Sequence, residues 1–424
     1  MTFRLLRSNL TAWLIPLLYV FAALTLGFTV PRLANTFLPG FVSTITVNAA
    51  IGIYSAIASG MIALTGIVFS LTFLTVQFSA TAYSPRLVHW IARDPVMSHS
   101  IGVFTATFLY ALVSLAWVDR NGSGRVPFAG IATVTALLIV SVIMFISLIQ
   151  RVGMLQVNRM LTFTGDQGRA VIENLYPPLA TPPTPSFLEP QPPCVQTVCH
   201  EGHPRFVQAL DTAALVRIAS RNGRVFDLVV SVGDAMLEGM PILRVLGEGA
   251  ALSESELKSA IELGRERTFE QDPKYAIRLL VDIAIKALSA AINDPTTAVQ
   301  ALDQIEDLLM RLGRRRLEIG VFCDARGNPR LLVSFPTWED FLRLAFDEIR
   351  YYGATSIQVM RRMKALVNEL ISLLPEERRP ALRRWQERIQ ASVERSFSNR
   401  DDKLEASAED RQGFGSTRRK TENG

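Results

Sequence analysis

The feature that most constrains this chain is a long stretch without charge. Between Arg32 and Arg86 none of the 53 residues is Asp, Glu, Lys or Arg. Such a stretch cannot form the surface of a water-soluble domain, because charged side chains make up about a quarter of an ordinary globular sequence. The whole chain of 424 residues is 20% charged and 49% hydrophobic. The sequence therefore predicts an α-helical membrane protein and excludes a plain cytosolic enzyme.

Four segments are apolar enough to cross a bilayer, which takes about 20 residues each. Arginine placement indicates their orientation, because positively charged loops stay in the cytoplasm. Seven Arg lie on the side of the N-terminal arm and three on the other side. We therefore expect both termini in the cytoplasm and the lipid bilayer as a partner. The expected transmembrane domain is 1–150, with spans at about 13–30, 51–78, 98–117 and 128–150.

The rest of the chain has the pattern of a soluble region. Strand and turn patterns alternate with capped helices, which predicts a mixed α+β domain in the cytoplasm. Eight of the seventeen residues at 177–193 are proline, which is typical of an extended linker. The expected order is a helical extension at 151–176, the linker at 177–193, the α+β domain at 194–375, a helix at 376–397 and a disordered tail at 398–424.

Several helix starts in the soluble half carry capping signals. Asp272 and Asp294 each precede a proline, so a capping carboxylate stands before a Pro at the first helical position. Ser253 and Thr337 begin sequences of the capping-box type. The helices expected from these starts span about 254–268, 273–291, 295–313 and 337–374.

The second span is unusually rich in small and hydroxyl side chains. Gly52, Ala56 and Gly60 are four apart, so they share one helix face on which another helix can approach closely. We therefore expect a homo-oligomer. The hydroxyls have two possible roles. They line a path for ions or water, or they pack between helices, and packing is the more common role of such residues. The pore or packing candidates are Ser55, Ser59, Ser70, Thr72, Thr75 and Gln77.

A second candidate is the polar face of the helix at 273–291. Arg278, Asp282 and Lys286 are four apart, and Asp before Lys is the favourable order for a pair on a helix. One interpretation is an ion-pair stripe on a core helix. The other is a surface for a ligand or a partner subunit, completed by the start of the next helix. The ligand or interface candidates are Arg278, Asp282, Lys286, Asn293, Asp294, Thr296 and Thr297.

Other chemistry has little support in the sequence. Cys194, Cys199, His200 and His203 crowd together, but two adjacent ligands close a tetrahedral zinc site awkwardly. We expect no metal and no cofactor. Nucleotide-binding, hydrolase and metalloprotease motifs do not occur, so nothing indicates an enzyme. The basic excess lies in residues 1–176, with ten Arg and four acids, where it suits lipid headgroups rather than nucleic acid.

Several strings resemble a bacterial family of predicted integral membrane proteins of unknown function. The membrane half contains FSLTFLTVQF at 69–78, YSPRL at 83–87, GVF at 102–104 and TFLYAL at 107–112. The soluble half contains QDP at 271–273, LVDIA at 280–284 and INDPTTA at 292–298. The resemblance covers roughly residues 1–375. It implies four N-terminal spans and a cytoplasmic domain in the bacterial inner membrane.

Two hypotheses of different classes follow. The first is a homo-oligomeric channel-like or passive transport protein of the bacterial inner (plasma) membrane, gated by its cytoplasmic domain. No expected span contains Asp, Glu, Lys or Arg, which argues against an ion-coupled pump. The alternative is a membrane-anchored sensor or scaffold that binds a partner or a small ligand through the soluble domain.

Overall fold

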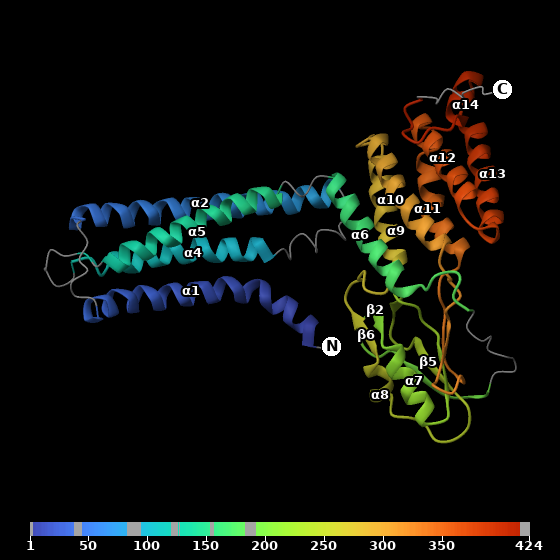
Figure 1. Cartoon of the computed structure of the whole chain (residues 1–424), viewed down its shortest axis with the longest axis horizontal. Coiled ribbons are helices and arrows are strands. Elements are labelled where there is room, and N and C mark those ends of the chain that lie inside the picture. The colour runs from blue at the N-terminus through green and yellow to red at the C-terminus, as the bar shows by residue number, and fades with distance from the viewer. Residues whose placement is uncertain are drawn as a thin grey trace. The chain divides into compact units, whose positions relative to one another are not determined.

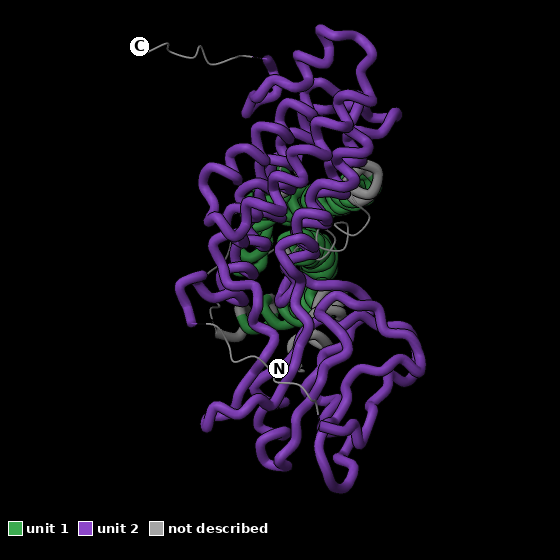
Figure 2. Tube along the Cα trace, turned by 90° about the vertical axis from the view of Figure 1, so that its right-hand side faces the viewer, with its two compact units in different colours: residues 1–156 green, residues 157–424 purple. Residues whose placement is uncertain are grey.

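The computed structural model describes residues 3–37, 45–82, 95–119, 126, 128–152, 157–182 and 192–415. The chain forms two compact units, residues 1–156 and residues 157–424 (Figure 2). Each unit has its own hydrophobic core.

The first unit consists of apolar helices (Figure 1). Among the described residues they are α1 (Phe3–Phe37), α2 (Val47–Ala82), α4 (Pro95–Leu115) and α5 (Phe128–Val152). Three segments are long and apolar enough to cross a membrane, namely Val47–Leu74, Val96–Leu115 and Phe128–Gln150. Helix α1 adds a shorter apolar stretch, Leu14–Val30. The predicted helical membrane half is confirmed, with three long helices and one shorter.

Helix α4 is the most buried of the long apolar helices and packs against α1, α2 and α5. In its apolar window 44% of the residues are buried, against 17% in α2 and 22% in α5. Gly102 lets α1 approach α4, because a Cβ added there would lie 2.6 Å from the ring of Tyr19. The hydroxyls of Thr107 and Ser141 lie 2.9 Å apart and hydrogen-bond α4 to α5. Most of α2 is therefore left outside the core of the single chain.

The second unit contains two sheets. The five-stranded sheet has the order β1-β5-β3-β8-β7, in which only β3 and β8 are parallel neighbours. The three-stranded sheet has the order β4-β2-β6 and is antiparallel. Val207, Phe226 and Leu331 belong to one core that both sheets share. The elements are β1 (Cys194–Cys199), β2 (Arg205–Leu210), α7 (Thr212–Arg221), β3 (Val225–Leu228), β4 (Ala235–Met236), β5 (Pro241–Leu246), α8 (Glu254–Ser259), β6 (Ile261–Gly264), β7 (Val321–Cys323) and β8 (Pro329–Val333).

A helical layer completes the second unit (Figure 1). Helix α10 packs against α6, α9, α11 and α12, and α6 also packs against α9. The expected helical extension at 151–176 corresponds to α6, which belongs to the second unit and begins five residues after the end of α5. The predicted mixed fold is confirmed. The helices are α6 (Val157–Leu175), α9 (Pro273–Ala287), α10 (Pro295–Gly313), α11 (Trp338–Tyr352), α12 (Ile357–Leu373), the 3₁₀ turn η2 (Glu376–Arg378), α13 (Arg379–Ser396) and α14 (Arg400–Ser407).

Two predicted helix starts are confirmed by their caps. The carboxylate of Asp272 accepts a hydrogen bond from the backbone N–H of Tyr275 at 3.1 Å. Asp294 accepts one from the backbone N–H of Thr297, also at 3.1 Å. A proline opens the helix in both cases, as the sequence predicted.

Two predicted helices are wrong in length. Helix α8 ends at Ser259, because the next residues form strand β6 beside β2. The side chain of Ser253 makes no cap hydrogen bond there. The helix expected from 337 to 374 is two helices, α11 and α12, which are separated at Gly353. The hydroxyl of Ser356 caps α12, so a new helix starts where the apolar period alone suggested continuation.

The end of the chain contains structure that its polar composition did not predict. We expected residues 398–424 to be disordered, whereas α14 packs against α12 and α13. Arg361 forms an ion pair with Glu405 and also donates to its backbone carbonyl. These polar contacts and the buried Ala406 hold this segment. Residues 416–424 lie outside the described part of the chain, as do residues 183–191 of the expected linker.

Candidate functional site

The candidates on the second span fall on two different sides of α2. Ser55, Ser59 and Ser70 are exposed on the single chain, as is Gln77. Thr72 is half-buried and lies eighteen residues after the buried Tyr54. Eighteen residues are about five full turns of an α-helix, so Thr72 shares the inward side with Tyr54. The side chain of Thr75 lies outside the described part of the structure.

The exposed side of α2 carries a row of small and polar residues, called here the α2 seam. An added Cβ at Gly52, Gly60 or Gly66 would meet no atom within 4 Å, so no described residue of this chain packs on that side there. Successive residues of the seam are four and three apart up to residue 70, the spacing of a heptad seam between two helices. The hydroxyl of Ser70 donates to the carbonyl of Gly66 at 3.0 Å. The seam consists of Gly52, Ala56, Ser59, Ala63, Gly66, Ser70 and Gln77, all exposed.

The polar face of α9 joins two helices of the second unit. Arg278 forms ion pairs with Asp282 at 2.6 Å and with Glu348 of α11 at 2.8 Å. The side chain of Asp282 is only 14% exposed, so this pair is largely covered. Lys286 is half-buried, and its carbonyl accepts from the hydroxyl of Ser289 at 2.7 Å. Arg278 is thus engaged within the domain, and a ligand role for this face stays a prediction.

The crowded start of α10 is built around a cap. Asn293 has a positive φ of 49°, a conformation that Asn tolerates better than most residues. Asp294 accepts from the hydroxyl of Thr297 at 2.6 Å as well as from its N–H. Thr296 accepts from Gln358 of α12 at 3.4 Å. These contacts join Asp294 to Thr297 and tie the start of α10 to α12.

The cysteine and histidine cluster does not converge. Cys194 is exposed at the edge strand β1, and His200 Nε2 lies 2.9 Å from the carbonyl of His203. Across the described ranges, no three His, Cys, Asp or Glu side chains are grouped to hold a metal ion.

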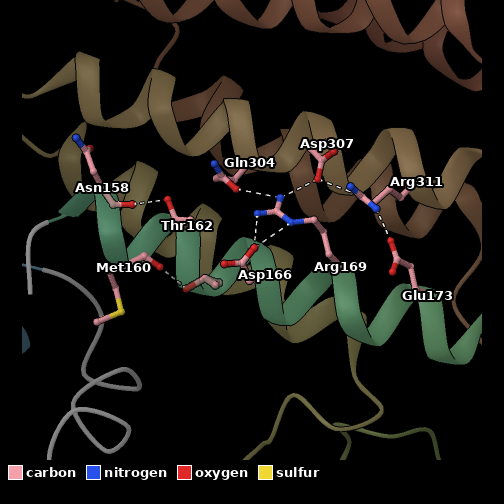
Figure 3. Close-up of polar contacts among 10 residues, drawn as sticks. Asn158, Met160, Thr162, Asp166, Arg169, Glu173, Gln304, Asp307 and Arg311 are labelled. Carbon is pink, nitrogen blue, oxygen red and sulfur yellow. Dashed lines mark hydrogen bonds and ion pairs between the residues drawn. The ribbon is translucent and has the colours of Figure 1, made fainter. Parts of the chain in front are cut away.

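Sequence reasoning missed a polar contact between α6 and α10, shown in Figure 3. Arg169 of α6 donates to Asp307 of α10 at 2.7 Å and to Asp166 at 2.8 Å. Arg311 of α10 reaches back to Glu173 of α6. We call these residues the α6–α10 clamp. The partners are 138 residues apart in sequence, so no local pattern could reveal them.

Close backbone packing reinforces the clamp. A Cβ added at Gly168 would lie 2.8 Å from Leu308 Cδ1 and 3.0 Å from Ala276 Cβ. Glycine is therefore needed where α6 lies against α9 and α10. Helix α6 follows α5, the last described membrane helix, in the chain. The contact of α6 with α9 and α10 therefore lies where the chain enters the second unit.

The fold and these sites define a multi-pass membrane protein that carries a mixed α/β domain. The chain belongs to the DUF2254 family, described as predicted membrane proteins, whose model matches residues 9–369. It is similar to uncharacterized proteins of Mycobacterium bovis and Mycobacterium tuberculosis, with 26% identity over 404 residues in each case. These alignments cover 92% of this chain and 78% of each relative. No solved structure matches the chain.

Proposed function

We propose that this protein is a homo-oligomeric, channel-like or passive transport protein of the bacterial inner membrane. Both termini lie in the cytoplasm, and the domain formed by residues 157–424 acts as the gate. The observation that carries the proposal is the α2 seam, which is exposed on the single chain, consists mostly of small residues and carries the hydroxyls of Ser59 and Ser70.

The shape of the seam favours self-association. Lipid tails gain nothing from glycine, whereas a second helix gains close backbone contact on a small-residue face. The heptad spacing suits a crossing angle of about +20°, the geometry of left-handed helix bundles. A second copy of α2 therefore fits the seam better than lipid tails do. Packing between copies also leaves Ser55, Ser59 and Ser70 at or beside the subunit contacts.

The hydroxyls at the edge of these subunit contacts favour a passive path. A conducting pore needs polar groups that bind weakly enough to let the solute leave. The seam offers hydroxyls and one amide, and the apolar stretch Val47–Leu74 contains no Asp, Glu, Lys or Arg. A pump would need ionisable relays at membrane depth.

The α6–α10 clamp supports a gating role for the second unit. Arg169 and Arg311 hold α6 to α10 by ion pairs that span two helices. A rearrangement of the helical layer would therefore move α6 with it. Since α6 follows α5 in the chain, that movement would be passed towards the membrane through the backbone.

Self-association is tested first, on the purified full chain in detergent. Ala63→Leu places a branched side chain in the seam, and Ala136→Leu is the matched control because Ala136 is exposed on α5. We expect the parent and Ala136→Leu to share one oligomeric mass by native mass spectrometry, and Ala63→Leu to shift towards the monomer. A monomeric parent would refute the proposal.

Conduction is tested in liposomes with K⁺ and Cl⁻ gradients and a potential-sensitive dye. Ser70→Leu is compared with two other variants. Thr72→Leu lies on the inward side of α2. Ser147→Leu lies on α5, where the Ser147 hydroxyl donates to a backbone carbonyl at 2.9 Å, as the Ser70 hydroxyl does on α2. We expect Ser70→Leu alone to lower flux by roughly tenfold, which a barrier of about 1.4 kcal/mol produces. An intact oligomer with no flux in any state would favour the sensor or scaffold alternative.

A further inference from the structure

Helices α11 and α13 pack against each other and carry a row of charged side chains along their contact. Two positions of this row pair an acid of α11 with a base of α13. A guanidinium nitrogen of Arg384 lies 3.5 Å from a carboxylate oxygen of Glu339, and one of Arg388 lies 2.9 Å from Asp347. Near the end of α11 the pattern changes, because the last charged residue on this side is Arg350. The row thus ends with a base of α11 that meets the basic side of α13.

Arg350 contacts a neutral hydroxyl in place of a carboxylate. Its Nη1 donates to the hydroxyl of Ser392 on α13 at 2.8 Å, and Ser392 is only 2% exposed. Its Nη2 lies 3.8 Å from Asp347 Oδ1, an oxygen that already accepts from Arg388 at 2.9 Å. One carboxylate oxygen therefore serves two guanidinium groups. The Arg350 side chain keeps 16% of its surface exposed.

A third arginine lies on the same side of α13. Arg388 precedes Ser392 by four residues, and Arg395 follows it by three. Residues at these spacings lie on one side of a helix, so both arginines flank the hydroxyl that Arg350 contacts. The side chain of Arg395 is exposed, and its Nε donates to the carbonyl of Ala391 at 3.1 Å. In the described part of the chain, Arg395 forms no ion pair with a carboxylate.

The charges of this group do not balance. Three arginines, Arg350, Arg388 and Arg395, share one carboxylate, so three positive charges meet one negative charge. The neighbouring Glu394 already forms an ion pair of 2.9 Å with a lysine of α14. Burial, and then the charge of Arg388, lower the pKa of Arg350. Asp347 opposes this decrease and Arg395 adds to it, so the three guanidinium groups lie close enough to repel one another. We call the three arginines the α11–α13 arginine cluster.

We propose that the α11–α13 arginine cluster binds a phosphate group, carried by a soluble metabolite or by a lipid headgroup. A phosphate group has a charge of about −1.5 to −2 at pH 7, which matches the excess of positive charge in the cluster. Its oxygens suit the paired N–H donors of guanidinium groups. The phosphate takes the place of the acid that the row lacks, between Arg350 and Arg395, and Arg388 adds a further positive charge.

Binding is measured by isothermal titration calorimetry on the full chain in detergent, in a phosphate-free buffer at pH 7. Sodium phosphate is compared with sodium acetate and sodium chloride at constant ionic strength. We expect saturable phosphate binding with a dissociation constant on the order of 1 mM, the range of so small a ligand. Acetate and chloride should bind at least roughly tenfold more weakly, because each carries one charge and offers fewer hydrogen-bond acceptors. No saturable phosphate binding, or equal affinity for acetate, would overturn the proposal.

Variants decide whether phosphate binds at this cluster. Arg395→Glu supplies the missing acid from an exposed position, so it should abolish phosphate binding and leave the fold intact. Arg350→Lys keeps the charge but loses the paired donors, and should weaken binding by roughly fivefold. Arg384→Gln is the matched control, because its side chain lies on the same side of α13 but is paired with Glu339. Full affinity in Arg395→Glu, or an equal loss in Arg384→Gln, would contradict the assignment.

A short-chain phosphatidic acid in the detergent micelle identifies the source of the phosphate group. If it displaces inorganic phosphate from the cluster, the site takes a lipid headgroup. If inorganic phosphate stays bound, the site takes a soluble phosphate. Both results support the proposal. The calorimetry measures no flux, so its outcome does not depend on the channel proposal.

Discussion

The sharpest stability prediction concerns Arg362, which ties α12 to α10. Its side chain is 4% exposed, and it forms ion pairs with Glu306 and, at 2.8 Å, with Asp303. The Glu306 side chain is 16% exposed, whereas that of Asp303 is 49% exposed. Arg362→Met keeps most of the apolar volume and removes the charge. Glu306 is then left as a nearly buried carboxylate without its cation.

The expected cost follows from these exposures. Breaking a buried ion pair from one side costs about 3–5 kcal/mol, because the remaining charge is uncompensated. Asp303 is half-exposed and adds little, since water replaces its partner. Glu306 keeps slight access to water, which places the loss near the lower end, at about 3 kcal/mol. Arg384→Met is the matched control, because its pair with Glu339 is more than half-exposed and is worth less than about 1 kcal/mol.

The loss should depend on pH and on Glu306. Burial raises the pKa of Glu306, while Arg362 opposes that rise. Without Arg362 the folded-state pKa rises further, so the variant's deficit is largest at neutral pH and shrinks as the pH falls through that pKa. Each pH unit below it recovers about 1.4 kcal/mol. Adding Glu306→Gln to Arg362→Met should restore about 2 kcal/mol at pH 7, because no buried charge remains.

Urea titrations of the full chain in detergent, followed by tryptophan fluorescence, give the free energies. Trp338 and Trp385 both report on the helical layer. A deficit below about 1 kcal/mol at pH 7, or one that neither acid nor Glu306→Gln relieves, would refute the buried pair.

Three further predictions concern other elements. Asp340→Ala should cost about 1 kcal/mol at pH 7, because it breaks the capping box of α11. Burial raises the pKa of Asp340, but the hydrogen bonds from Thr337 outweigh it and the net shift is downward. This loss should therefore persist down to the ordinary Asp pKa of about 3.9 and shrink as the pH falls through the lower folded-state pKa in parallel urea titrations; a loss independent of pH would contradict the carboxylate cap. Gly168→Val should cost about 1–3 kcal/mol by overpacking α6, and an unchanged melting temperature would rule out the close contact. Gly102→Leu should lower the melting temperature of the full chain by several degrees, roughly what 1–3 kcal/mol produces, by separating α1 from α4.

Local chemistry made part of the fold predictable. The length and hydropathy of the spans, and the Asp-Pro starts of α9 and α10, depend on neighbouring residues only. The break between α11 and α12 was missed because the apolar period continues across it. Its signals, Gly353 and the cap Ser356, are individually weak and occur in many loops.

The sites were less predictable because they depend on distant parts of the chain. The row Gly52, Ala56 and Gly60 was visible in the sequence, but only burial shows that the described residues of the chain do not pack on this side of α2. Burial also separates Ser70 from Thr72, which the sequence placed in one group. A cavity of the second unit is lined by residues from Leu175 to Pro336, and no spacing rule connects them.

Helix α6 connects the second unit to the apolar helices along the chain, and Arg169 and Glu173 fix its body to α10. Its first residue, Val157, is five residues beyond Val152, the last of α5. A link of that length reaches at most about 17 Å, which sets an upper limit on the separation of the two helix ends. A displacement of α6 beyond this limit must pull on α5. Coupling therefore requires only that a rearrangement of the helical layer change how α6 is held.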